Sequence, residues 1–225
     1  MQEKLYSPLL HERIRMKNRV IIVGGGAAGM LASIFAAKKG CEVTLFEKNE
    51  KLGKKLYITG KGRCNVTNNC DPEELLNSVV TNAKFLYSAF YTFTSQDMME
   101  FLEEAGTALK TERGNRVFPC SDHSSDVIRA LERQMKKYGV RIHLKSQVER
   151  LLLEEGTAAG IILTDGSVHR AEAVIVATGG LSYPTTGSTG DGYRFAREAG
   201  HTVTDLSPSL VPLRTKRYEI GRAHV

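Results

Sequence analysis

Arg19-Val20-Ile21-Ile22-Val23-Gly24-Gly25-Gly26-Ala27-Ala28-Gly29 is the stretch that decides the fold. Its β-branched run, Arg19–Val23, is typical of a parallel strand that is buried on both faces. The small and apolar residues 27–39 are expected to form a helix that Gly40 closes, and residues 42–46 alternate as a second strand. The sequence therefore predicts a complete βαβ unit.

The glycine spacing in this turn (residues 24–29, the glycine turn) has a physical reason in dinucleotide binding. Gly24 permits a tight turn, Gly26 lets the backbone approach a pyrophosphate, and Gly29 allows close packing of helix on strand. The helix that starts with Ala27 and Ala28 directs free N–H groups towards the phosphates. A glycine-rich turn can also be purely structural, so this motif alone is weak evidence.

An acidic residue strengthens the motif. Glu47 ends the second predicted strand, 18 residues after Gly29. A carboxylate at that place can accept hydrogen bonds from ribose hydroxyls and would repel a ribose phosphate. Strand, helix, second strand and acid in register favour dinucleotide binding over a structural turn.

The rest of the chain does not continue with the βαβ repeats that a simple NAD domain would show. A polar and basic loop (residues 48–69, the basic loop) follows Glu47, and then come three helical segments, the last starting from a Ser95 cap. The helices are expected at 73–80, 84–93, 96–104 and 125–138, and the strands at 141–144, 148–153, 160–164, 167–170 and 173–177, with Asp165-Gly166 as a hairpin turn.

The last predicted strand ends in Thr178-Gly179-Gly180, which leaves the backbone almost free of side chains where a strand would meet a cofactor crevice. The chain therefore has two glycine-rich strand ends, one near each end of the sequence. Two such ends suit a long ligand and favour FAD over NAD.

With these motifs the sequence resembles the BaiN-like or aminoacetone-oxidase-like FAD-dependent NAD(P) oxidoreductases. The matching stretches are VGGGAAGMLA (23–32), GKKLYITGKGRCNVTN (53–68), RVFP (116–119) and ATGGLSYPTTGSTGDGYRFAREAG (177–200). The resemblance implies an α/β fold of the FAD-binding Rossmann-like type, as in glutathione reductase and fumarate reductase. It implies a parallel sheet with a β-meander, and a substrate domain that is largely missing here.

The same resemblance implies FAD as the cofactor and assigns residues to its parts. Glu47 and Lys48 would lie at the adenosine ribose and the Val148 backbone at adenine, while Asp191 resembles a carboxylate that fumarate-reductase-like flavoproteins place on FAD. Arg63, Asn65 and Gly180 would lie near the flavin or its linker. The expected cofactor-binding residues are Gly24, Gly26, Ala27, Ala28, Gly29, Glu47, Lys48, Arg63, Asn65, Val148, Thr178, Gly179, Gly180 and Asp191.

Four of the residues in these motifs have a second reading. Arg63 is an ordinary surface charge or, because glycines flank it, an anion-binding group; we favour the second. Cys64 lacks a partner thiol and is expected to be structural. Tyr183 either stacks near the flavin or anchors its loop, and Asp191 also suits the cap of a helix that begins near Gly192.

The expected function is hydride transfer through a flavin. The donor is NAD(P)H or a small-molecule substrate, and the acceptor is an enone-like compound or oxygen. No residue stands out as the catalytic acid or base. The alternatives are an FAD-binding RNA-modifying protein and an inactive truncated FAD-binding fragment. The histidines show no ligand spacing, so no metal site is expected.

Composition limits the partners. The net charge is +6, but much of the excess lies at the two ends of the chain, so nucleic-acid binding is not expected. Its longest strongly apolar runs, 20–23 and 174–177, are far shorter than the ~20 residues that cross a bilayer, so no membrane partner is expected. Four cysteines without C-x-x-C spacing suit reduced thiols in the cytoplasm. The oligomeric state is left open.

The organisation expected along the chain has four parts. Residues 1–15 have no clear period and are expected to be a non-native extension, and residues 16–205 form the FAD-binding domain. Residues 206–215 are expected to begin a truncated second domain. Residues 216–225 resemble translated sequencing-adapter DNA and are expected to be an artefactual tail.

Overall fold

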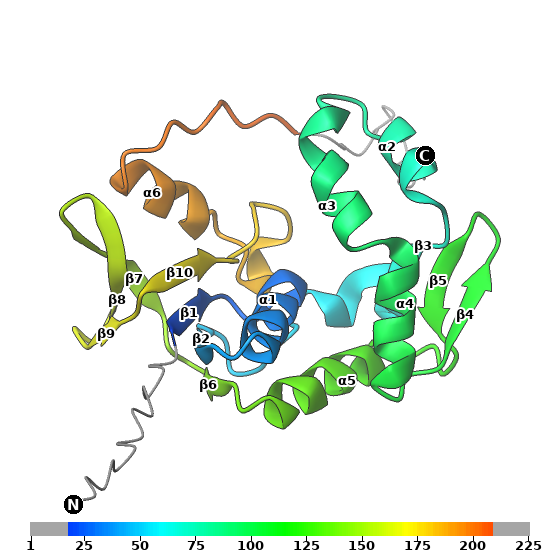
Figure 1. Cartoon of the computed structure of the whole chain (residues 1–225), viewed down its shortest axis with the longest axis horizontal. Coiled ribbons are helices and arrows are strands. Elements are labelled where there is room, and N and C mark those ends of the chain that lie inside the picture. The colour runs from blue at the N-terminus through cyan, green and yellow to red at the C-terminus, as the bar shows by residue number, and fades with distance from the viewer. Residues whose placement is uncertain (1–17, 209–225) are drawn as a thin grey trace, which may run out of the picture.

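A four-stranded parallel sheet lies at the centre of the computed structural model, which describes residues 18–208 (Figure 1). The strand order is β10-β1-β2-β6, and all three pairings are parallel. Helix α1 connects β1 to β2, and Gly40 takes a left-handed φ of +88° just after it, so the expected βαβ unit is confirmed. The elements are β1 Arg19–Val23, α1 Ala27–Lys38, β2 Glu42–Phe46, β6 Arg141–His143 and β10 Ala173–Val176.

Strand β1 is buried on both faces because its residues alternate between two hydrophobic cores. Val20 and Ile22 point into the core formed with α1 and with α5 (Ser124–Lys137). Ile21 and Val23 point into the core on the opposite face. The uninterrupted β-branched run thus follows from the two layers that cover the sheet.

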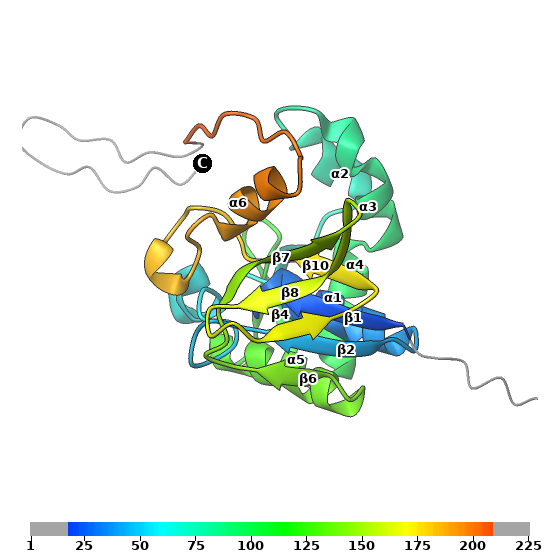
Figure 2. The same cartoon turned by 90° about the vertical axis from the view of Figure 1, so that its left-hand side faces the viewer.

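The second layer is an antiparallel meander of β7 (Val148–Glu154), β8 (Thr157–Leu163) and β9 (Val168–Arg170). Figure 2 shows this meander in front of the parallel sheet. Ser167 donates its backbone N–H to the Asp165 carboxylate at 2.9 Å in the turn between β8 and β9. The expected β-meander is confirmed, and β8 begins three residues earlier than the sequence suggested.

A third, small sheet lies beyond the helices, with the order β3-β5-β4. Its strands are Thr67–Asn68 (β3), Leu109–Glu112 (β4) and Arg116–Pro119 (β5), and α4 (Ser95–Glu104) contacts it. The expected Ser95 cap is wrong, because Thr94 caps α4 through a reciprocal capping box with Asp97.

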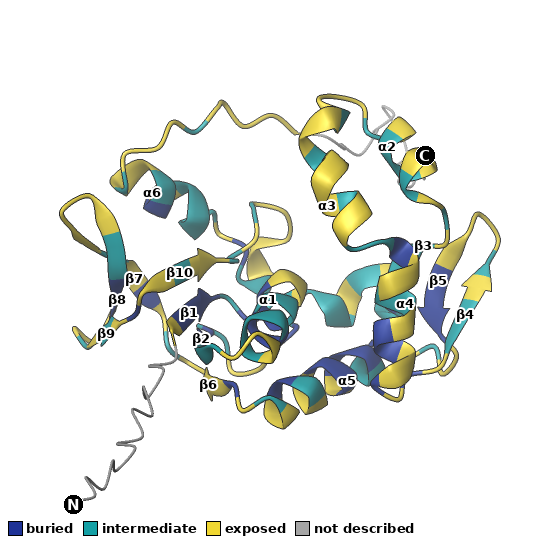
Figure 3. Cartoon of the chain, viewed as in Figure 1, coloured by how far each residue is buried: buried dark blue, intermediate teal, exposed yellow. Residues whose placement is uncertain are grey.

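Residues 72–92 form a helical segment, the α2–α3 arm, that is mostly exposed (Figure 3). It consists of α2 (Pro72–Asn77), η2 (Ala83–Leu86) and α3 (Tyr87–Thr92), none of which has a buried residue. Helix α2 begins one residue earlier than predicted, since Pro72 suits the first helical position and Asp71 accepts the Glu74 N–H. The single helix expected at 84–93 is wrong: the chain changes from a 3₁₀ turn to α3 at Tyr87.

Three further elements complete the described chain. They are η1 (Leu56–Gly62) within the basic loop, η3 (Pro184–Thr186) and α6 (Asp191–Glu198). None of the described helices is long and apolar enough to cross a membrane. The expected extension at 1–15 and the expected tail at 216–225 lie outside the described residues, as does most of the expected second-domain segment 206–215.

Candidate functional site

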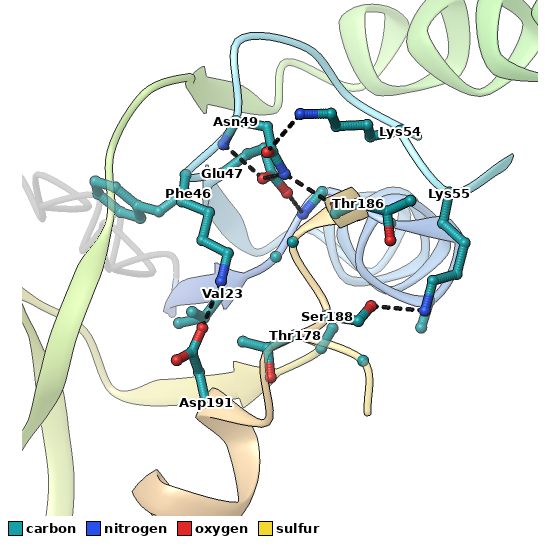
Figure 4. A pocket seen from close by; sticks show the side chains of 18 of the residues that line it. Val23, Phe46, Glu47, Asn49, Lys54, Lys55, Thr178, Thr186, Ser188 and Asp191 are labelled. Atoms are coloured by element: carbon teal, nitrogen blue, oxygen red, sulfur yellow. Dashed lines mark hydrogen bonds and ion pairs between the residues drawn. The ribbon is translucent and has the colours of Figure 1, made fainter. Parts of the chain in front are cut away.

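A cavity of about 620 Å³ opens where β1, β2 and β10 end (Figure 4). Its wall includes the first residues of the glycine turn, the start of the basic loop and the segment that follows β10. The carboxyl ends of parallel strands are where open α/β sheets bind ligands. The two glycine-rich strand ends of the sequence therefore meet at one cavity.

The glycines of the turn divide into packed and open positions. A Cβ at Gly29 would stand 1.8 Å from the Gly24 carbonyl oxygen, and one at Gly24 would stand 2.5 Å from the Ala177 oxygen. A Cβ at Gly26 would meet no atom within 4 Å, although Gly26 lines the cavity. Gly24 and Gly29 thus serve close backbone packing, while Gly26 keeps free space at the cavity wall.

The N-terminus of α1 faces the same cavity. Ala27 and Ala28 line the wall, and neither donates its N–H to any described residue. An α-helix leaves its first N–H groups without internal acceptors, and these groups carry a positive field. The glycine turn and the helix therefore present a pocket suited to an anion.

Glu47 is 7% exposed, and its carboxylate is held by the protein itself. Oε2 accepts the Gly25 N–H at 2.6 Å, and Oε1 accepts both the N–H and the side-chain amide of Asn49 at 2.7 Å. Figure 4 shows Glu47 between Asn49 and the glycine turn. The carboxylate holds the turn in place and forms part of the cavity wall. Its contact with a ribose stays a prediction.

Lys48 and Asp191 join across the cavity. The Lys48 Nζ lies 2.7 Å from Asp191 Oδ2 and also donates to Thr189 Oγ1 at 2.7 Å. Burial works to raise the pKa of Asp191, but the hydrogen bond and charge of Lys48, together with the Thr189 hydroxyl and the charge of Arg194, hold that pKa below its ordinary value. Gly190, not Asp191, is the N-cap of α6, so the reading of Asp191 as a side-chain cap is wrong.

Aromatic and apolar side chains close one end of the cavity. Val148, Phe46 and Phe195 line it there, and all three belong to the core beneath the meander. Two histidines contact the Phe46 ring: His143 stacks at 4.9 Å and His169 lies at 4.7 Å. Val148 therefore lies at an apolar wall of the cavity, and its contact with adenine stays a prediction.

The segment that follows β10 also lines the cavity. Thr178 and Gly179 line the cavity, whereas Gly180 is not among its lining residues. The Thr178 Oγ1 is buried and has no hydrogen-bond partner. A buried hydroxyl without a partner is uncommon, and here it belongs to a residue of the cavity wall.

The structure separates Arg63 and Asn65 from the cavity lining. Arg63 donates to Glu112 at 2.5 Å and to Asp122 at 2.8 Å, and its guanidinium lies 4.0 Å from the Phe118 ring centroid. Asn65 is exposed. The glycine-flanked arginine therefore binds two carboxylates of the protein, and a contact with FAD stays a prediction for both residues.

Cys64 is 2% exposed and packs in the core beside α1. Burial raises the pKa of its thiol, which keeps the sulfur in its unreactive protonated form. The structure therefore agrees with the structural reading of this cysteine. None of the described residues forms a group of histidine, cysteine or acidic side chains that could hold a metal ion.

Several lining residues were not singled out from the sequence. The motif matches covered the basic loop and the segment after β10, but no single residue in them carried a signal beyond charge. Apart from strand and turn residues that the sequence placed nearby (Val23, Gly25, Phe46, Val176 and Ala177), the residues missed are Asn49, Lys54, Lys55, Leu56, Thr59, Ser146, Gln147, Thr186, Gly187, Ser188 and Phe195.

The chain matches the family model described as the HI0933-like protein Rossmann domain over residues 18–215. It is 34% identical over 209 residues to a 3-dehydro-bile acid delta(4,6)-reductase of Clostridium scindens, a match that covers 92% of this chain and 50% of the relative. It is also 34% identical to a ribosomal RNA dihydrouridine synthase of Haemophilus influenzae, over 85% of this chain and 48% of the relative. The chain thus spans about half the length of these relatives.

Among solved structures, the fold is similar to the open conformation of a flavocytochrome c3 fumarate reductase. The TM-score is 0.60 at 23% identity, covering 81% of this chain and 40% of that chain. A 3-ketosteroid-delta4-(5alpha)-dehydrogenase from Rhodococcus jostii RHA1 gives a TM-score of 0.60 at 18% identity, covering 79% and 49%. The expected FAD-binding Rossmann-like fold class of the fumarate reductase type is confirmed.

Family model, relatives and fold agree with the motifs from which the resemblance was drawn. The motifs of the chain had indicated a resemblance to FAD-dependent oxidoreductases, and the chain belongs to the HI0933-like Rossmann-domain family.

Proposed function

We propose that this chain is the FAD-binding part of an FAD-dependent oxidoreductase. The enzyme transfers a hydride between NAD(P)H or a small-molecule substrate and an acceptor, which is an enone-like compound or oxygen. A small molecule, and neither nucleic acid nor a membrane, is the partner that we propose.

One observation carries the FAD proposal: within the glycine turn, the position that faces the cavity has free space for a ligand, and the positions that pack on the fold have none. Gly26 leaves its wall bare, while Gly24 and Gly29 have no room for a side chain. The unpaired N–H groups of Ala27 and Ala28 suit a pyrophosphate. The residues present therefore fit FAD.

Each wall has a separate task in this proposal. The glycine turn and the α1 N-terminus hold the pyrophosphate, Glu47 and Asp191 accept hydrogen bonds from hydroxyls, and the apolar end at Val148 excludes water from the adenine. When bound, FAD supplies the hydride chemistry, and the protein supplies orientation and electrostatic tuning. No described residue is assigned as a proton donor.

The names of the relatives support two classes of acceptor. A 3-dehydro-bile acid delta(4,6)-reductase supports an enone-like small molecule, and it matches the larger share of this chain. Two ribosomal RNA dihydrouridine synthases, from Haemophilus influenzae and Escherichia coli, support an RNA-modifying protein as the second candidate, at 34% and 33% identity.

The first experiment is the visible spectrum of the purified chain after incubation with FAD and removal of unbound flavin. We expect retained flavin absorbance in the ratio of one FAD per chain. A folded chain that retains none would reject the proposal and return the glycine turn to NAD or to structure.

The second experiment separates the two acceptor classes. NADH or NADPH is added without oxygen and the loss of flavin absorbance is followed; an enone-containing sterol or a ribosomal RNA fragment is then added as acceptor. Recovery of the absorbance with the sterol alone supports the small-molecule enzyme. Recovery with the RNA alone supports the second candidate.

A further inference from the structure

The charges of the cavity wall are unequally compensated. Five charged side chains line it: Glu47, Lys48, Lys54, Lys55 and Asp191. Lys48 pairs with Asp191 at 2.7 Å, and Lys54 lies 3.6 Å from Glu50. Glu47 accepts three hydrogen bonds.

Lys55 differs from the other lysines of the wall. Its ammonium donates to the Ser182 carbonyl at 2.7 Å and to Ser188 Oγ at 2.6 Å, both of which are neutral oxygens. No carboxylate among the described residues forms an ion pair with it. Lys55 is therefore the described lining residue whose full positive charge has no negative partner.

The position of Lys55 is fixed by the glycine turn. Gly53 donates its N–H to the Gly25 carbonyl at 2.8 Å, and a Cβ at Gly25 would stand 2.4 Å from Leu52 Cδ2. The backbone two residues before Lys55 is thus hydrogen-bonded to the glycine turn. Figure 4 shows the Lys55 side chain reaching Ser188, whose Oγ would lie 2.9 Å from a Cβ at Gly179.

Two sources of positive potential therefore border one cavity. One is the N-terminus of α1, where Ala27 and Ala28 carry unpaired N–H groups. The other is the Lys55 ammonium. Lys55 is half-buried, so the attraction between its charge and a bound anion is screened less than it would be in bulk water. Together they select a ligand with more than one negative charge, and a pyrophosphate carries two.

We propose that Lys55 is a phosphate-binding residue that holds the pyrophosphate of the dinucleotide opposite the N-terminus of α1. This inference rests on the proposed function, because that proposal identifies FAD as the ligand. Its test also uses ADP, so the role of Lys55 can be decided separately. Lys55 also ties the segment 182–188 to the basic loop, and its charge, rather than this tie, is what the phosphate requires.

The test measures the dissociation constants of ADP and of FAD by calorimetry for the full chain and for three variants. Lys55→Met removes the charge, and Lys55→Arg keeps it. Lys61→Met is the matched control, because Lys61 lies in the same loop, is exposed and does not line the cavity. The unfolding midpoint of each ligand-free variant is recorded beside the binding.

We expect Lys55→Met to weaken ADP and FAD alike by roughly ten- to a hundredfold, the usual loss of a charge-assisted hydrogen bond. Lys55→Arg should recover most of that affinity, and Lys61→Met should bind as the unchanged chain does. Unchanged ADP affinity in Lys55→Met overturns the inference. Equal losses in Lys55→Arg and Lys55→Met also overturn it, since the tie and not the charge would then matter.

The two ligands keep the two proposals apart. If the unchanged chain binds ADP but not FAD, the proposed function fails, and the ADP series still decides the role of Lys55. If the unchanged chain binds FAD while Lys55→Met leaves both affinities intact, the role of Lys55 fails alone. A folded chain that binds neither ligand overturns both.

Discussion

The glycine turn and the loop at residues 60–65 look alike in sequence, but the structure uses them differently. Both are rich in glycine and both lie beside a group suited to an anion, the α1 N-terminus in one and Arg63 in the other. The glycine turn leaves the N–H groups of Ala27 and Ala28 unpaired at a cavity. The loop at 60–65 gives its arginine to Glu112 and Asp122.

The lesson concerns partners rather than composition. A glycine-rich loop is free to bind a ligand when its polar groups have no acceptor within the fold, as at the glycine turn. It is structural when the fold supplies that acceptor, as at Arg63. Four substitutions test this difference, beginning with the one that should do most damage.

Gly29→Ala should have the largest effect on the fold. Its Cβ would lie 1.8 Å from the Gly24 carbonyl oxygen, and backbone cannot move aside as a flexible side chain can. We expect the free energy of unfolding to fall by roughly 3 kcal/mol, measured by denaturant titration of the ligand-free chain. Wild-type stability in this variant would show that α1 is able to move away from β1.

Gly26→Val should abolish FAD retention while the fold survives. The added side chain would enter open space at the cavity wall, and the φ of −79° at Gly26 suits any residue. The cost to stability should be at most about 1 kcal/mol, the size of a helix N-cap effect. The visible spectrum after removal of free flavin gives the result, and unchanged flavin content in the folded variant would reject the assignment of the turn.

Arg63→Met should do the reverse and lower stability without changing FAD affinity. The variant loses both ion pairs and leaves Glu112 and Asp122 with Lys110 as their counter-charge among the described residues. The groups are partly exposed, so we expect the unfolding midpoint to fall by only a few degrees. A large loss of FAD affinity would instead place Arg63 on the ligand, as the family resemblance implies.

Glu172→Gln should have the smallest effect and provides the baseline. Glu172 pairs with Arg19 at the amino ends of β10 and β1, and the hydrogen bond from Arg19 lowers the pKa of its carboxyl from 4.5 to about 2. A lowered folded-state pKa adds stability that is present above 4.5 and is lost as pH falls towards 2. The unchanged chain should therefore lose more stability than Glu172→Gln across that window.

That comparison is made by denaturant titration above and below the window. FAD affinity at neutral pH should be the same for both proteins, since the pair lies at the end of the sheet away from the cavity. Equal acid sensitivity of the two proteins would show that the pair adds nothing to the folded state.

The sequence predicted the parts of the fold that local patterns determine. The run Arg19–Val23, the glycine spacing and the alternation of Glu42–Phe46 identified the βαβ unit, because each signal lies within a few residues of the next. The strands of the meander followed from their residue patterns and from the turn at Asp165-Gly166, and the family resemblance implied their arrangement as a meander. The position of Thr178 and Gly179 at the cavity also agreed with their strand-end signal.

Contacts between distant segments were not predictable in the same way. Arg63 meets carboxylates 49 and 59 residues away, and Lys48 meets Asp191 across 143 residues. No spacing rule in the sequence connects such pairs. The predictions at Ser95 and at residues 84–93 were wrong for a local reason. Neighbouring residues there offered nearly equal alternatives for the helix cap and for the start of α3.

The α2–α3 arm differs from β1 in a property that no substitution is needed to reveal. None of its three helical elements buries a residue, whereas four of the five residues of β1 are buried. Amide hydrogens of the arm should therefore exchange with deuterated solvent through small local openings. The free energy of these openings should be far below that of global unfolding. Those of Val20 to Val23 should exchange only when the whole sheet opens, so the arm and the sheet form separate cooperative units of one chain.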